Sequence, residues 1–309
     1  MFVINFGDDN LVDLSEQADY EFPHPVQRWV MLLVVFEYAD KMLVGAQALG
    51  TAFAIGPQLL VTARHVLDPV LADVHAAAPG LPPNMVLHAM FLTDELLLGK
   101  EAVHYLPIPI SNVAMNASHD LAILTTRTLA PASGKQPVFM CAPLTTRAPA
   151  VGSYLFALGY AKARAVVTSV NEDGMPTIRI DQRVMASRGR VEERYGQGRD
   201  TVMINFPALQ GDFPSLSGMS GGPVVAEDGH VCGVICSSVD STDGTSWTST
   251  CSLLPFLFTL PVKAQLDGVS GSWSIRDLAE RGIVPTDGSY AKVQFEKDGQ
   301  DLHVAWSIE

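Results

Sequence analysis

The sequence predicts an all-β protein in which two sets of short strands form two β-barrels. The apolar runs are brief and are separated by turn-forming residues, which is typical of strands in a barrel or a sandwich. The longest uninterrupted apolar run, Trp29–Phe36, is much too short to span a bilayer. With 309 residues, 48% of them hydrophobic, the chain can bury one large core or two modest ones.

The first set of strands lies in residues 26–133, which we expect to form the first barrel. Its members are rich in apolar and β-branched residues and are expected at Val30–Phe36, Leu43–Leu49, Ala52–Ile55, Leu59–Thr62 and Leu121–Thr125. Between the last two strands, residues 72–84 are rich in Ala and Pro and predict a short helix and a loop. Residues 1–25 precede the barrel and are expected to form an acidic arm, either disordered or docked on the back of a barrel.

The second set of strands lies in residues 134–260, which we expect to form the second barrel. Its members are expected at Tyr154–Leu158, Val166–Val170, Thr177–Ile180, Pro223–Val225 and Val231–Cys236. Residues 186–198 are charged and contain glycines, so they predict an exposed loop or a twisted hairpin. A mobile segment that gates a cleft is the functional alternative for the same residues.

Residues 261–309 predict a separate C-terminal unit made of a helix and a β-hairpin. Ser274 can cap a short helix that runs to Glu280, with Gly282 as its stop. Polar and apolar residues then alternate over 290–296 and 301–307, around a turn at 297–300, which predicts a hairpin. We expect this extension either to cover an edge strand or to bind a regulatory protein.

The segment 218–223 (GMSGGP) places Ser220 between glycines at a tight turn. Glycine permits backbone conformations that a side chain would forbid, and it lets main-chain N–H groups approach a substrate carbonyl. An exposed nucleophile beside preorganised N–H donors is what acyl transfer requires. A serine alone is a poor nucleophile near neutral pH, so this interpretation needs a base and an orienting acid elsewhere.

Candidates for both groups stand upstream of Ser220. His65 follows the strand-like run Leu59–Thr62 in a turn of small residues. Asp120 lies at the start of the short apolar strand Leu121–Thr125. The chain order His, Asp, Ser is one of the orders in which a catalytic triad recurs on unrelated folds.

Four segments together resemble the trypsin/chymotrypsin-like serine peptidases. They are GTAFAI at 50–55, TARHV at 62–66, DLAIL at 120–124 and GMSGGPVV at 218–225. The likeness is to bacterial intracellular and stress-protease members of that superfamily rather than to secreted digestive ones, and it spans roughly residues 45–260. It implies two six-stranded Greek-key β-barrels of the chymotrypsin type, with the active site at their seam.

The resemblance also implies a role for each matching residue. His65 is expected to be the general base, Asp120 its orienting carboxylate and Ser220 the nucleophile. The backbone N–H groups of Gly218 and Ser220 are expected to form the oxyanion hole. No P-loop, dinucleotide fingerprint or calcium loop is present, so no cofactor is expected.

Three departures from the family pattern bear on specificity and activation. Met219 stands where animal digestive members have an aspartate, which argues against activation by insertion of a new N-terminus. Cys236 takes the place of a serine that usually supports the catalytic acid. The substrate-binding residues are expected to be Pro214, six before the nucleophile, and Ser237 and Ser238, on a strand edge that pairs with substrate backbone.

Composition predicts a soluble cytoplasmic enzyme, and the family resemblance implies protein or peptide substrates. The formal charge of −13 disfavours nucleic acid and anionic membranes as partners, since both are polyanions. Residues 1–20 contain no Lys or Arg and lack the pattern of a signal peptide. The four cysteines lack the spacing of a disulfide framework and are expected to be reduced, and no metal site is expected from the cysteines or the eight histidines.

We therefore expect a serine endopeptidase of limited specificity and regulated activity, working through an acyl-enzyme. The alternative is a catalytically idle or latent module of the same fold that binds extended peptides or a partner protein.

Overall fold

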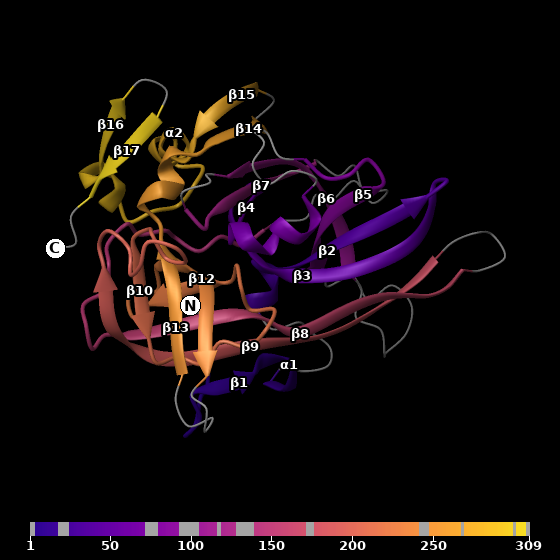
Figure 1. Ribbon diagram of the computed structural model, residues 1–309, viewed down its shortest axis with the longest axis horizontal. Helices are drawn as coiled ribbons and strands as arrows, with labels where there is room; N and C mark the ends of the chain where they lie inside the picture. Colours follow the sequence, from indigo (N-terminus) through magenta and orange to yellow (C-terminus); the bar gives the residue numbers. More distant parts are fainter. Residues whose placement is uncertain are drawn as a thin grey trace.

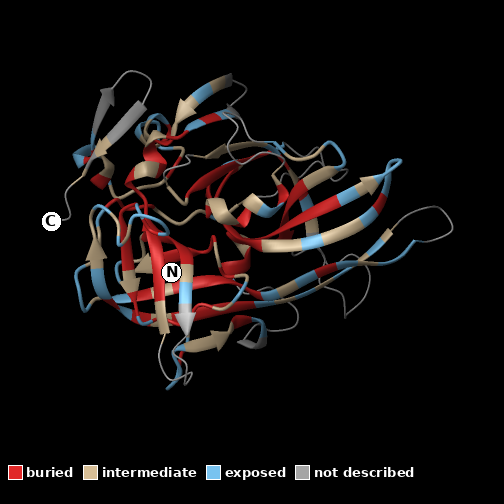
Figure 2. Cartoon of the chain, in the orientation of Figure 1, coloured by how far each residue is buried: buried red, intermediate tan, exposed pale blue. Residues whose placement is uncertain are grey.

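The computed structural model describes residues 4–17, 25–71, 80–92, 105–115, 119–127, 139–170, 176–240, 247–266, 269–298 and 301–306. It confirms the predicted all-β class with two strand assemblies. A smaller C-terminal unit is added to them (Figure 1). Buried residues concentrate along the strands of both assemblies, whereas exposed residues gather at the hairpin ends (Figure 2).

The first assembly is a closed barrel in the order β2-β3-β4-β7-β6-β5. Its strands are β2 (Val30–Ala39), β3 (Met42–Gly56), β4 (Leu59–Thr62), β5 (Met85–Leu92), β6 (Tyr105–Met115) and β7 (Ala122–Thr126). Every residue of β4 and of β7 is buried, which explains why these two strands are uninterrupted apolar or small-residue runs. Their pairing sets Thr62 opposite Ala122, so the segment after β4 lies close to the segment before β7.

The second assembly is a ring of six strands with a seventh strand added to its edge. Its order is β1-β9-β10-β13-β12-β11-β8, and pairing of β9 with β8 closes the ring. The strands are β1 (Leu11–Asp13), β8 (Tyr154–Val170), β9 (Pro176–Tyr195), β10 (Ala208–Gly211), β11 (Pro223–Ala226), β12 (Val231–Asp240) and β13 (Trp247–Leu253). The expected chymotrypsin-type pair of six-stranded assemblies is therefore observed.

Several predicted elements are longer than expected. The runs predicted at 43–49 and 52–55 form one strand, β3, and those at 154–158 and 166–170 form one strand, β8. Residues 186–195 are not a loop: they continue β9, which pairs with β8 and then with β10. Between Ser187 and Glu192, charged side chains alternate with buried residues, so this part of the strand has one solvated face. Most of the predicted 72–84 insert lies outside the described residues.

The acidic arm is docked where the structure describes it. β1 pairs antiparallel with β9, with Leu11 opposite Ser187. Helix α1 (Leu14–Gln17) follows, and Leu14 is fully buried against the core. The hydroxyl of Ser15 accepts a hydrogen bond from the N–H of Val184 at 3.1 Å. The N-terminal segment is thus an edge strand of the second assembly.

The remaining helices are short. They are η1 (Pro25–Arg28), η2 (Arg64–Val66), η3 (Asp68–Val70), η4 (Pro255–Thr259), η5 (Ser289–Lys292) and α2 (Ile275–Glu280). As predicted, Ser274 caps α2, and Asp277 completes a capping box by accepting from the Ser274 backbone. In the part of the chain that the structure describes, no helix is both long and apolar enough to cross a membrane.

The C-terminal unit contains two hairpins, one more than predicted. β14 (Pro261–Leu266) pairs with β15 (Val269–Ser274), and β16 (Gln294–Asp298) pairs with β17 (Asp301–Ala305). The segment before η5 is bonded to the connection between the barrels, because Thr145 donates its hydroxyl proton to Asp287 Oδ2 at 2.8 Å. Burial raises the pKa of Asp287, but hydrogen bonds from Ser289 and Thr145 outweigh it and leave that pKa below its ordinary value.

Candidate active site

His65 and Asp120 are brought together by the pairing of β4 with β7. His65 lies in η2, just after β4, and Asp120 lies just before β7. The His65 Nδ1 and Asp120 Oδ2 atoms are 2.7 Å apart, and the His65 backbone N–H donates to Asp120 Oδ1 at 2.9 Å. Both carboxylate oxygens therefore bind the same residue. The pairing orients the ring and leaves its Nε2 as the nitrogen not engaged by Asp120.

The environment of His65 favours its protonated form. Burial lowers the pKa of His65, but the hydrogen bond to Asp120 and the charge of Asp120 together outweigh burial. The pKa of His65 is consequently above its ordinary value. Its side chain is 40% exposed, against 14% for that of Asp120, so the imidazole faces solvent and the carboxylate lies behind it.

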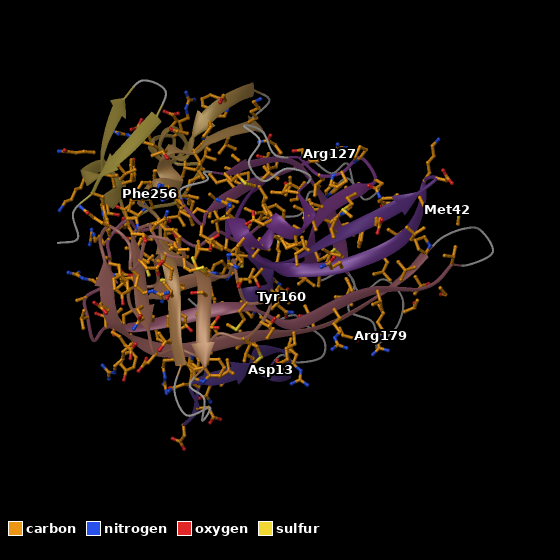
Figure 3. The ribbon with its side chains drawn as sticks, in the orientation of Figure 1. Asp13, Met42, Arg127, Tyr160, Arg179 and Phe256 are labelled. Carbon is orange, nitrogen blue, oxygen red and sulfur yellow. The ribbon has the colours of Figure 1, made fainter. Side chains whose placement is uncertain are left out.

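Two titratable side chains, those of Cys236 and His119, neighbour Asp120. The Cys236 thiol, at the position where the resemblance places a supporting serine, lies near the Asp120 carboxylate and donates to Val234 O at 3.3 Å. Burial, together with the Asp120 charge, raises the pKa of Cys236 well above its ordinary value, so the thiol keeps its proton. The neighbouring His119 ring lies 3.5 Å from the Phe256 ring, centroid to centroid, and burial lowers the pKa of His119 to about 4. Phe256 belongs to η4 and is labelled in Figure 3.

Ser220 lies in a tight turn before β11, which we call the nucleophile loop (residues 216–222). Gly218 has φ +94° and Gly221 has φ +84°, values that L side chains rarely adopt. The N–H groups of Met219 and Gly221 donate to Leu216 O and Ile235 O at 3.0 and 2.9 Å. Within the described residues, the N–H groups of Gly218 and Ser220 have no hydrogen-bond acceptor.

The nucleophile loop is packed against the segment that carries His65. A Cβ on Gly50 would lie 2.9 Å from Val66 Cγ1 and 3.0 Å from the Ser220 carbonyl oxygen. A Cβ on Gly221 would lie 3.1 Å from the Ala63 nitrogen. Ser220 thus lies beside the turn 63–66, although no hydrogen bond between its hydroxyl and His65 is present among the described residues. Such bonds are often long in a ligand-free enzyme and tighten when substrate binds.

Thr51 joins the two assemblies, and no role for its side chain was predicted from the sequence. Its N–H donates to Ser220 O at 2.9 Å, and its hydroxyl donates to Gly218 O at 2.8 Å. The same hydroxyl accepts from the N–H of Tyr160 at 2.9 Å. Figure 3 labels Tyr160 where β8 passes β3. The Thr51 carbonyl accepts from the Thr62 hydroxyl at 2.6 Å.

The residues expected to bind substrate are clustered in part. Pro214 lies in the loop that leads to Ser220, and the Ser238 hydroxyl donates to Ser215 O, next to Pro214, at 2.7 Å. Ser237 pairs with Thr250 of β13. After Ile235, β12 pairs with β13 and no longer with β11 among the described residues. The edge of β12 that faces away from β13 is therefore open there.

All four cysteines are free thiols, as predicted, and Cys232, Cys236 and Cys251 are buried. Across the described ranges there is no group of three or more His, Cys, Asp or Glu side chains placed to hold a metal ion. The structure brings His65 and Asp120 together and places the loop of Ser220 beside their turn.

Residues 50–234, more than half of the chain, match the family described as the trypsin-like peptidase domain. The chain belongs to this family. His65, Asp120 and Ser220 all lie inside the matched stretch of this trypsin-like peptidase domain. No curated protein sequence matches the chain.

Several solved structures are similar to this trypsin-like peptidase domain at low sequence identity. The active form of the Rv3671c protease from M. tuberculosis is 17% identical, with a TM-score of 0.45 and coverage of 85% of either chain. The MamO protease domain from Magnetospirillum magneticum is 14% identical, with a TM-score of 0.43 over 77% of this chain and 98% of that chain. Deg5 is 18% identical, with a TM-score of 0.43 over 75% and 86%.

Proposed function

We propose that this trypsin-like peptidase domain is a serine endopeptidase that cleaves protein substrates through His65, Asp120 and Ser220. The observation that carries the proposal is the double hydrogen bond of Asp120 to His65, in a turn that packs against the loop of Ser220. An oriented imidazole next to a serine in a glycine-supported turn is an arrangement suited to nucleophilic acyl transfer.

The proposed reaction proceeds in two half-reactions. Ser220 Oγ attacks the substrate carbonyl while His65 Nε2 takes the hydroxyl proton, and the carbonyl oxygen becomes an oxyanion facing the N–H groups of Gly218 and Ser220. The C–N bond then breaks, and His65 returns the proton to the leaving amine. Water, deprotonated by His65, attacks the acyl-enzyme, and Ser220 regains its proton as the acid leaves. Asp120 holds the ring and stabilises the imidazolium.

Labelling with a fluorophosphonate probe tests the proposal directly. The purified chain is expected to label, and Ser220→Ala and His65→Ala are expected to abolish labelling. Cys141→Ala is the matched control for a nucleophilic side chain outside the site and should label like the wild type. If Ser220→Ala still labels, another nucleophile reacts and the assignment is wrong.

A latent or peptide-binding module is the second candidate, and one observation favours it. The Ser220 hydroxyl and His65 share no hydrogen bond among the described residues. A latent module predicts no labelling by the isolated chain, with labelling gained when a partner is added. A binding module predicts peptide affinity that survives Ser220→Ala.

Limited specificity, regulation and cytoplasmic location belong to the same proposal. The hairpin β16–β17 extends the chain beyond the matched family stretch and offers a place for a regulatory partner. The four free thiols favour a reducing compartment. Broad degradation of unfolded casein by the isolated chain would count against limited specificity.

The pH dependence of the reaction follows from the environment of His65. The base must be neutral to accept the Ser220 proton, and Asp120 raises the pKa of His65 above its ordinary value. Activity is therefore expected to fall as the pH falls through that raised pKa, with a midpoint above about 6.5. The measurement is kcat/KM for a peptide substrate, or the labelling rate, between pH 5 and 9. A midpoint well below the ordinary histidine value would contradict the assigned pairing.

A further inference from the structure

We propose that Thr51 is a positioning residue that holds the backbone of the nucleophile loop so that the Gly218 and Ser220 N–H groups converge on one point. The role of these two N–H groups as oxyanion donors rests on the proposed function. The hydrogen bonds that support the positioning role do not depend on it.

Each peptide plane in the loop is tied by a hydrogen bond. Because a peptide unit is planar and trans, its C=O and N–H point in opposite directions, and fixing one fixes the other. The Ser217 carbonyl accepts from the Lys162 N–H at 2.8 Å, which directs the Gly218 N–H away from β8. The Met219 carbonyl accepts from the Gly222 N–H at 2.9 Å. This bond fixes the direction of the Ser220 N–H, which belongs to the same peptide plane.

Thr51 supplies bonds for the other two planes between Ser217 and Gly221. Its hydroxyl donates to Gly218 O and its N–H donates to Ser220 O. The N–H groups of these same planes, those of Met219 and Gly221, donate within the second assembly. The two planes held by Thr51 therefore alternate with the two planes whose N–H groups remain available.

The hydroxyl proton of Thr51 has one possible direction. The Tyr160 N–H donates to Oγ1, so the oxygen is the acceptor there, and the Gly218 carbonyl can only accept. Thr51 is fully buried, so water cannot readily replace its hydroxyl. Without that hydroxyl, the Gly218 carbonyl and the Tyr160 N–H would each lose this hydrogen bond.

Thr51 is also connected to the base. Its carbonyl accepts from the hydroxyl of Thr62, the last residue of β4, and His65 follows three residues later. A single buried threonine of the first barrel thus links the turn that carries the proposed base to the loop that carries the proposed nucleophile.

The test compares three threonine variants. Thr51→Val keeps the shape of the side chain and removes the hydroxyl, whereas Thr51→Ser keeps the hydroxyl. Thr125→Val is the matched control, because Thr125 is buried in the same barrel and its hydroxyl has no partner among the described residues. Circular dichroism first establishes a temperature at which all variants are folded.

Two measurements are made on each variant. The first is the rate at which the fluorophosphonate probe labels the protein, measured over a range of probe concentrations. It is resolved into the maximal rate constant kinact and the half-saturating probe concentration KI. For Thr51→Val we expect kinact to fall about 10- to 100-fold with KI unchanged, because a displaced donor weakens oxyanion stabilisation and not probe binding. Thr51→Ser is expected to restore most of the rate, and Thr125→Val to match the wild type.

The second measurement is amide hydrogen exchange, which needs no activity. Exchange at the Met219 and Gly221 N–H groups is expected to be faster in Thr51→Val than in Thr125→Val. Unchanged exchange in Thr51→Val would overturn the positioning role, as would an unchanged kinact. If the wild type does not label at all, the proposed function fails, and exchange alone then decides the role of Thr51.

Discussion

Replacing Asp120 by asparagine is expected to lower turnover about ten-thousandfold while the protein stays folded. The amide has nearly the same shape, but its NH₂ group cannot accept the proton that His65 Nδ1 donates at 2.7 Å. The ring would then hold the wrong tautomer and would lose the charge that stabilises the imidazolium. The acid limb of the pH profile should also move to lower pH, because Asp120 supplies the hydrogen bond and the main charge that raise the pKa of His65.

The measurement is kcat/KM of Asp120→Asn across the pH range, with Asp287→Asn as the control. Asp287 is likewise a hydrogen-bonded aspartate, but it accepts from Thr145 and Ser289 in the C-terminal unit. Asp287→Asn is expected to lower the free energy of unfolding and to leave kcat/KM unchanged. An active Asp120→Asn variant, or an equal loss in both variants, would show that Asp120 does not orient the base.

Replacing Gly221 by alanine is expected to lower the free energy of unfolding by about 3 kcal/mol or more. The residue has φ +84°, and its added Cβ would collide with Thr51 O and Thr62 Oγ1, both of which belong to the first barrel. The Thr62–Thr51 hydrogen bond would have to break or the nucleophile loop would have to move. Either change should also reduce the labelling rate.

Gly229→Ala provides a closely matched control for this prediction. Gly229 has φ +86°, yet an added Cβ there would meet no atom within 4 Å. Its cost is therefore backbone strain alone, about 1 kcal/mol. Urea unfolding of the two variants separates collision from strain. Equal losses of stability would mean that the contact between Gly221 and the first barrel is not tightly packed.

The sequence was most informative where local chemistry sets the structure. The buried strand β4 was predicted to the residue because Leu59–Thr62 is an unbroken run of strand-forming residues. The cap at Ser274 was predicted because a capping residue acts within one helical turn. The approach of His65 to Asp120 was expected from the family resemblance, which carries long-range information that composition lacks.

The sequence was least informative where pairing partners decide the structure. Strands β5, β6, β10 and β13 were not predicted. Prolines interrupt β6 and polar residues occupy much of β13, so the local preference for a strand is weak in these two segments. These segments become strands by pairing with neighbours, not through strong local preference. The role of Thr51 was equally hidden. A threonine in an apolar strand favours β structure in general, and its four partners become visible when distant segments are brought together.

The pairing of β1 with β9 has a consequence for the order in which the chain is built. Leu11 leaves the ribosome early, but its partner Ser187 is made only after the whole first barrel and β8. The N-terminal strand therefore stays unpaired until β9 has been made, whereas the first barrel can close earlier. Contacts between residues far apart in the sequence form late in folding. During that interval the nascent chain carries an open strand edge, which is where association with other chains begins. Completing β9 provides the arm with its partner and leaves β1 with one open edge instead of two.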